Sequence, residues 1–269
     1  MTALYILLSL VLLVGGFIAY PRWRDKRILR GPFPASWQPI LERRLPFFSK
    51  LSESERSQLQ RMIRLFVAKK RFYGCGGLEL NDEIRITVAA EACLLLLNRN
   101  SSLYSGLQHI LIYPSAFRVN RQWHQADGIV SQEHQGLLGE SWSHGKVILS
   151  WDDVEAGIEN FHDGHNVALH EFSHQLDSES GTANGAPLLE KNSYQTWAQV
   201  LSAEFAKLTD SLEHGHASLM DTYGATNPAE FFAVATEVFF EKPLQMAEKH
   251  PALFAELSLY YRVDPRQWQ

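Results

Sequence analysis

The spacing of apolar and polar positions along the chain predicts helices and two short strands. Ser52 followed by Glu55 forms a capping box, so we expect a helix from there to about Lys70. Residues 83–97 (EIRITVAAEACLLLL) are rich in apolar residues and alanine, which favours a buried helix. The β-branched and aromatic runs QHILIYP and GKVILSW lie between turn residues and indicate strands at 108–114 and 145–151.

The first twenty residues carry a long apolar run. Residues 2–20 hold no charge and would span roughly 28 Å as a helix, close to the ~30 Å hydrocarbon core of a bilayer. No lysine or arginine precedes the run, and Phe17 and Ile18 stand where a signal-peptide cleavage site needs small residues. We therefore expect residues 1–21 to form a transmembrane anchor rather than a cleaved signal.

Basic residues follow the apolar run directly and predict how the anchor is oriented in the membrane. Residues 1–30 hold five basic groups and one acidic group, a net charge of +4. Because the whole chain has a formal net charge of −5, residues 31–269 carry −9. The positive-inside rule places the basic flank in the cytoplasm, which predicts a single-pass protein of the inner (cytoplasmic) membrane. Residues 22–45 are then a basic flank and linker, and 46–269 form an acidic domain facing the cytoplasm. An acidic domain is unsuited to direct nucleic acid binding.

Candidate chemistry lies in the stretch NVALHEFSHQLD, from Asn166 to Asp177. His170, Glu171 and His174 spell H-E-x-x-H. Because positions i and i+4 are neighbours on a helix, the two histidines can bind one metal ion, and Glu171 then lies where it can contact a water on that ion. A catalytic zinc has three protein ligands and one open position, so a third ligand is expected elsewhere.

The third ligand has several candidates. The metzincin pattern fails, because Asp177 stands where its glycine belongs and no histidine follows. In NPAEFFAVATEVFF, Asn227 is a plausible N-cap and Glu230 falls in the first turn of a helix. Glu237 lies two turns further on a similar face, and Asp177 lies one turn after His174; either could instead orient a histidine. Spacing alone favours Glu230 only slightly.

The remaining cysteines and histidines carry less weight. Cys75 and Cys93 stand in contexts that indicate no metal or redox pair. Four histidines in polar, turn-like segments are expected at the surface without a metal role: His162, His165, His214 and His216.

Taken together, these segments resemble the Mlc titration factor A family of glucose-regulated zinc metallopeptidases. The resemblance rests on NVALHEFSHQLD, on DTYGATNPAEFFAVATEVFF and on GKVILSW, and covers most of residues 50–265. It implies a gluzincin-like fold with one Zn²⁺ per chain, His170, His174 and Glu230 as ligands, and Glu171 as catalytic base. It also implies that Tyr223 lies near the metal and helps stabilise the reacting carbonyl, although a core role for this tyrosine is an equal alternative.

The expected fold class is therefore α+β and mainly helical: a zincin-like metallopeptidase domain with a small mixed sheet, after one N-terminal transmembrane helix. The expected function is zinc-dependent hydrolysis of peptide bonds, with the substrate along a sheet edge at residues 147–151. Two alternatives remain, a non-catalytic zinc module that sequesters a transcriptional repressor and a zinc amidase acting on a small molecule or cell-wall peptide. Expected partners are a peptide or protein substrate and, by family resemblance, that repressor.

Overall fold

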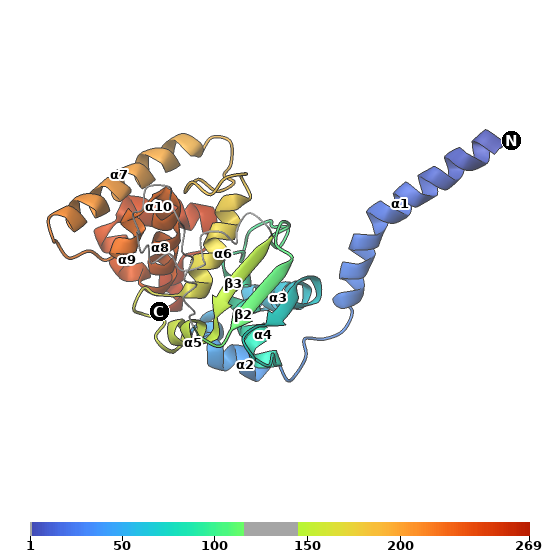
Figure 1. Ribbon diagram of the computed structural model, residues 1–269, viewed down its shortest axis with the longest axis horizontal. Helices are drawn as coiled ribbons and strands as arrows, with labels where there is room; N and C mark the ends of the chain where they lie inside the picture. Colours follow the sequence, from blue (N-terminus) through green and yellow to red (C-terminus); the bar gives the residue numbers. More distant parts are fainter. Residues whose placement is uncertain (1, 116–144) are drawn as a thin grey trace, which may run out of the picture.

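A computed structural model describes residues 2–115 and 145–269 of the chain. In these ranges the protein is mainly helical, with one small sheet (Figure 1). The α-helices are α1 (Thr2–Ile28), α2 (Gln38–Arg44), α3 (Glu53–Lys69), α4 (Asp82–Leu94), α5 (Trp151–Glu159), α6 (Val167–Ser178), α7 (Tyr194–Glu213), α8 (Pro228–Glu241), α9 (Pro243–Lys249) and α10 (Pro251–Tyr261). The strands are β1 (Arg71–Gly74), β2 (His109–Tyr113) and β3 (Lys146–Ser150), and short 3-10 helices include η1 (Phe48–Lys50), η4 (Thr222–Ala225) and η5 (Pro265–Trp268).

Local sequence signals account for several of these elements. The capping box before α3 is present, because the Ser52 hydroxyl accepts a hydrogen bond from the Glu55 amide while the Glu55 carboxylate accepts one from the Ser52 amide. Helix α4 is buried along nearly all its length, and β2 and β3 fall within the predicted strands. These sequence predictions are confirmed.

The sheet is parallel rather than mixed. Its strand order is β1-β2-β3, with both pairs parallel, so β3 forms one edge of the described sheet. Helix α4 lies between β1 and β2 in the sequence, so the chain passes through this helix back to the end of the sheet where β1 started before it enters β2. Such a crossover makes the two strands parallel. The sequence prediction included β2 and β3 but not β1, and it did not give the direction in which the strands pair.

Helix α1 corrects the expected membrane anchor. It continues past Pro21 to Ile28, so charged residues fill its last two turns, and it extends away from the rest of the molecule (Figure 1). Over the described ranges, no helix is both long and apolar enough to cross a membrane. The predicted transmembrane helix, and the single-pass inner-membrane location derived from it, are therefore wrong. The prediction treated the uncharged run as a separate segment, whereas the structure joins it to the basic residues in one helix.

Helix α6 lies inside the molecule, between the sheet and the C-terminal helices (Figure 1). It contacts β3, α4 and α5 on one side and α8 on the other. Its apolar face is anchored by Phe172, which is fully buried and packs against the rings of Phe66 and Tyr104. This packing fixes the rotation of α6 about its axis and so determines where its polar residues point.

Candidate metal centre

Helix α6 presents three buried polar residues to one place. Its N-cap is Asn166, whose side-chain oxygen accepts a hydrogen bond from the Leu169 amide at 3.0 Å. One turn later come His170 and Glu171, followed by His174, and their exposed fractions are 9%, 0% and 0%. Burying a polar group costs free energy unless the group is hydrogen-bonded. The polar groups that partner these three side chains must therefore come from another element.

Helix α8 supplies that environment. The Asn227 side chain caps its start by accepting from the Ala229 and Glu230 amides, and Pro228 occupies the first turn, as the sequence predicts. Glu230 thus lies in the first turn of α8, which packs directly on α6. Its side chain is buried and faces the two histidines.

Three potential ligand atoms converge between the two helices. The Glu230 Oε2 atom lies 3.0 Å from His170 Nε2 and 3.3 Å from His174 Nε2, and the two Nε2 atoms are 3.1 Å apart. Two ligand atoms bound ~2.1 Å from a tetrahedral zinc would be about 3.4 Å apart. The observed separations are close to that value. The donor set of His170, His174 and Glu230 therefore fits one metal ion of zinc size.

A second carboxylate of α8 orients the first histidine. Glu237 Oε1 accepts a hydrogen bond from His170 Nδ1 at 2.8 Å, and Glu237 Oε2 accepts one from the Asn166 amide at 2.5 Å. With its proton on Nδ1, His170 presents the lone pair of Nε2 to the centre, as a metal ligand must. Glu237 thus contacts the far side of His170 and does not join the convergent group.

The electrostatics of this centre favour positive charge. Burial lowers the pKa of His170, but hydrogen bonds to Glu230 and Glu237 and the nearby Glu171 charge outweigh burial and raise it to about 10. The pKa of His174 is lowered to about 4, chiefly by burial. Burial also acts to raise the pKa of Glu230, yet its bonds with the two histidines bring it down to about 2. The carboxylates therefore favour positive charge at this place.

Tyr223 stands beside the centre on η4. Its ring centroid lies 6.1 Å from that of His170, and half of the side chain is exposed, so it is not a core residue. Burial, followed by the charges of Glu230 and Glu171, raises the pKa of its hydroxyl to about 12. The phenol therefore keeps its proton at neutral pH and can donate a hydrogen bond.

Asp177, the other carboxylate considered from the sequence, serves a different purpose. Its Oδ2 atom accepts a hydrogen bond from the Gly185 amide at 2.7 Å, which ties the loop after α6 to the helix. Burial raises its pKa to about 6, against hydrogen bonds from that loop. Asp177 is thus bound to the loop backbone rather than to the group formed by His170, His174 and Glu230.

Sequence reasoning missed a buried link behind α6. The Asn166 side chain donates to Glu91 Oε1 of α4 at 2.8 Å, while the Asn166 amide donates to Glu237. Glu91 is fully buried, and burial raises its pKa to about 8. Two signals pointed to this link: Asn166 stands directly before the helical pattern, and Glu91 interrupts the apolar run VAAEACLLLL, well after the acidic first turn of its helix.

A pocket of about 400 Å³ opens beside the first histidine. His170, Glu237 and Tyr223 line it together with residues from α5 and the loop before α6. The histidines predicted to lie at the surface include His165, which is exposed at the rim of this pocket and 3.8 Å from Asp221. A ligand can therefore approach the centre from solvent.

Comparison with known proteins now agrees with this geometry. Residues 20–262 match the family described as glucose-regulated metallo-peptidase M90. The chain belongs to this family. The resemblance drawn from the sequence is thereby confirmed, and the family description is that of a metallopeptidase.

Its relatives match along most of their length. An uncharacterized protein of Synechocystis sp. is 43% identical over 265 residues, which are 97% of this chain and 96% of the relative. Mlc titration factor A of Klebsiella pneumoniae is 33% identical over 232 residues, 85% of this chain and 86% of the relative. Mlc titration factor A of an Escherichia coli strain is 32% identical over 234 residues, 86% and 87% of the two chains.

Proposed function

We propose that this protein is a zinc-dependent peptidase that hydrolyses peptide bonds. The observation that carries the proposal is the convergence of His170, His174 and Glu230 beside a buried Glu171. A set of three ligands leaves a fourth position open, whereas structural zinc sites usually close it with a further cysteine or histidine. Among the described residues, the group capable of holding a metal contains only these three side chains.

The proposed ligands are His170, His174 and Glu230, and each residue around them has a distinct role. When bound, zinc lowers the pKa of a coordinated water towards ~7 and polarises the scissile carbonyl. Glu171 accepts the proton of the attacking water and passes it to the leaving amine. Its complete burial suits this transfer, because a carboxylate that is not surrounded by bulk water passes the proton on rather than losing it to solvent.

Tyr223 is proposed to stabilise the carbonyl oxygen as it gains negative charge. Its hydroxyl stays protonated at neutral pH and its ring lies beside His170, so it can donate to that oxygen. The substrate is proposed to lie along β3, which is an edge strand of the sheet within the described residues and contacts α6, as an added strand held by main-chain hydrogen bonds.

A second candidate function comes from the relatives. Two of those compared above carry the name Mlc titration factor A, and this name motivates the proposal that the protein binds and sequesters a transcriptional repressor. In that case the metal would stabilise the fold and Glu171 would have no catalytic role.

The two proposals differ in what Glu171→Gln does. The experiment compares full-length wild type and Glu171→Gln for metal content by elemental analysis and for hydrolysis of a panel of peptides. One zinc per chain in both, with turnover in wild type alone, supports the peptidase. Zinc in both and turnover in neither favours the binding protein, and equal turnover in both removes Glu171 from the mechanism. A chain that binds no zinc contradicts the proposed cofactor.

A further inference from the structure

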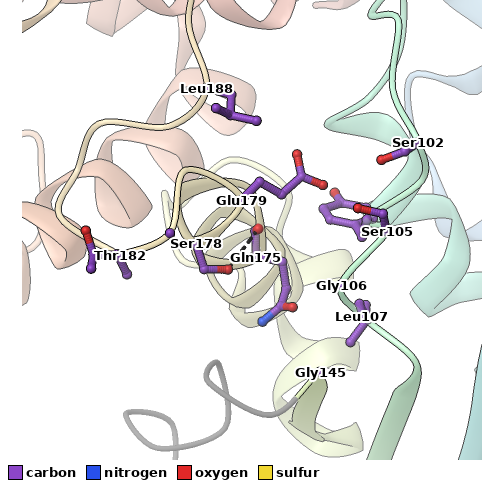
Figure 2. A pocket seen from close by; sticks show the side chains of 13 residues that line it. Ser102, Ser105, Gly106, Leu107, Gly145, Gln175, Ser178, Glu179, Thr182 and Leu188 are labelled. Carbon is purple, nitrogen blue, oxygen red and sulfur yellow. Dashed lines mark hydrogen bonds between the residues drawn. The ribbon is translucent and has the colours of Figure 1, made fainter.

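A second, larger pocket lies along the C-terminal half of α6. It has a volume of about 680 Å³ and separates the helix from the segment that leads into β2 (Figure 2). Gly145, directly before β3, and Leu188, in the loop before α7, complete its wall. The pocket therefore lies next to the first residue of β3 and against α6, the helix that carries H-E-x-x-H.

The first polar group in this pocket is Gln175. It is only 5% exposed, yet its Nε2 atom has no hydrogen-bond partner in residues 2–115 and 145–269. Figure 2 shows its amide reaching from α6 into the space beside Gly145. A buried donor without an acceptor destabilises the protein, so a ligand carbonyl that accepts from it is bound favourably.

The second polar group is Glu179, the only charged side chain among the described residues that line the pocket. Its Oε1 atom is buried and lacks a hydrogen-bond partner among the described residues. Burial raises the pKa of this carboxyl, although the charges of Arg99 and Lys70 act in the opposite direction. A cation that enters the pocket and donates to this oxygen relieves the burial cost.

The opposite wall is held in place by Lys70. Its ammonium group donates to the Tyr104 and Leu107 carbonyl oxygens at 2.7 and 2.6 Å, and both of these residues line the pocket. Two of its three protons are used in this way. Lys70 therefore shapes the wall and does not itself occupy the cavity.

We propose that this pocket binds a lysine or arginine side chain of the peptide substrate close to the bond that is cut. The inference rests on the proposed peptidase function. Glu179 binds the cationic end of the side chain, Gln175 donates to a backbone carbonyl of the peptide, and apolar parts of Leu107 and Leu188 pack along the aliphatic stem.

Distances along the helix agree with this arrangement. Gln175 lies one turn and Glu179 two turns after Glu171, which places them ~6 and ~12 Å along the axis from the proposed base. One step of extended peptide covers ~3.4 Å, and a lysine stem adds roughly 6 Å. A basic side chain within one or two residues of the scissile bond therefore reaches Glu179.

The test measures binding separately from hydrolysis. Zinc-loaded, full-length Glu171→Gln is titrated with fluorescent peptides that differ at a single position, which carries lysine, arginine, glutamine or norleucine, and the position is moved along the peptide. At the matching position, lysine and arginine are expected to bind at least about tenfold more tightly than norleucine. Adding Glu179→Gln is expected to abolish this preference, whereas adding Glu213→Gln, an exposed control on α7, leaves it unchanged.

A second variant covers the case in which Glu179→Gln does not fold. Leu188 is 53% exposed at the rim, so Leu188→Lys is tolerated and places a competing ammonium group at the pocket. It is expected to weaken the lysine and arginine peptides at least fivefold relative to norleucine, by about 1 kcal/mol of charge repulsion.

The outcomes separate this inference from the proposed function. No preference for lysine or arginine at any position, or a preference that survives both pocket variants, overturns the pocket assignment even if wild type hydrolyses peptides. A preference that the variants abolish, in a protein whose wild type cleaves nothing, supports the pocket and contradicts the peptidase proposal.

Discussion

At the scale of single residues, Glu237 connects the first histidine of the centre to the start of its own helix. One of its oxygens accepts from His170 and the other from the Asn166 amide. The Glu237→Gln variant replaces one of these two acceptor oxygens with an NH₂ group. This NH₂ group then faces either the His170 N–H or the Asn166 N–H and cannot accept from it. We expect zinc affinity to fall by ~10 to 100-fold, because an imidazole ligand loses its orientation and basicity.

Competition with a chelating indicator measures this loss, and Glu241→Gln is the matched control. Glu241 lies one turn further along α8 and is equally buried, but it accepts from the Gly164 amide rather than from a histidine. Equal loss of zinc affinity in both variants would show that the effect comes from damage to α8 and not from His170.

Glu91 gives a prediction about pH. Its pKa is raised by burial from 4.5 to about 8, so the folded protein keeps a proton that the unfolded chain releases. Stability contributed by this group is therefore full below pH 4.5 and falls as pH rises to 8, by on the order of 3 to 5 kcal/mol. Glu91→Gln cannot lose a proton and still accepts from Asn166, so the free energy of unfolding should fall less between pH 5 and pH 8.

Urea unfolding at several pH values measures this slope. Glu83→Gln on the same helix is the control, because Arg43 and Arg44 outweigh burial and lower the pKa of Glu83, so it titrates below the measured range. An unchanged slope in Glu91→Gln would show that Glu91 is ionised in the folded protein.

At the scale of elements, the start of α6 should matter more than the start of α8. Asn166 caps α6 and also donates to buried Glu91, whereas exposed Asn227 caps α8. We expect Asn227→Ala to cost about 1 kcal/mol and Asn166→Ala about 2 to 3 kcal/mol, since the latter also leaves a buried carboxyl without its donor. Denaturant unfolding of the two variants makes the comparison; equal losses would mean that the bond to Glu91 contributes nothing.

Elements whose signals are local could be predicted from the sequence. The capping box of α3, the Asn-Pro start of α8 and the apolar content of α4 each lie within one short segment. The strand β1 was missed, because its four residues are mostly exposed and show no alternation. Both strand pairs, β1 with β2 and β2 with β3, form between segments that are distant in the chain, and so the parallel direction of the sheet could not be predicted from local patterns.

The metal centre likewise combines residues that one short segment predicts with a residue that only the packing of two helices selects. Spacing on one helix was enough to put His170 and His174 on a common face, and they do lie together. Which carboxylate faces them depends on how α8 rotates against α6, and a helical pattern alone left Glu230, Glu237 and Asp177 open. The structure separates the three by their partners: both histidines for Glu230, His170 and Asn166 for Glu237, and a loop amide for Asp177.

At the scale of the whole molecule, the proposed metal ion would cross-link two helices that are far apart in the chain. His170 of α6 and Glu230 of α8 are separated by 60 residues. An ion that binds only the folded state stabilises it by about 2.7 kcal/mol at a free concentration one hundred times its Kd. For a chain of this size each kcal/mol corresponds to ~2–4 °C, so removing the metal should lower the Tm by ~5–11 °C.

Thermal unfolding of full-length protein, with and without a chelator, measures this shift, and added zinc should reverse it. Glu230→Gln is expected to show little further shift with chelator, because it has already lost the ligand that joins the helices. In Tyr223→Phe the shift should match wild type, because Tyr223 is proposed to act on the substrate and not to bind zinc. A chelator shift of equal size in Glu230→Gln would place the stabilising ion elsewhere in the protein, and would remove the link between α6 and α8 on which the proposed centre depends.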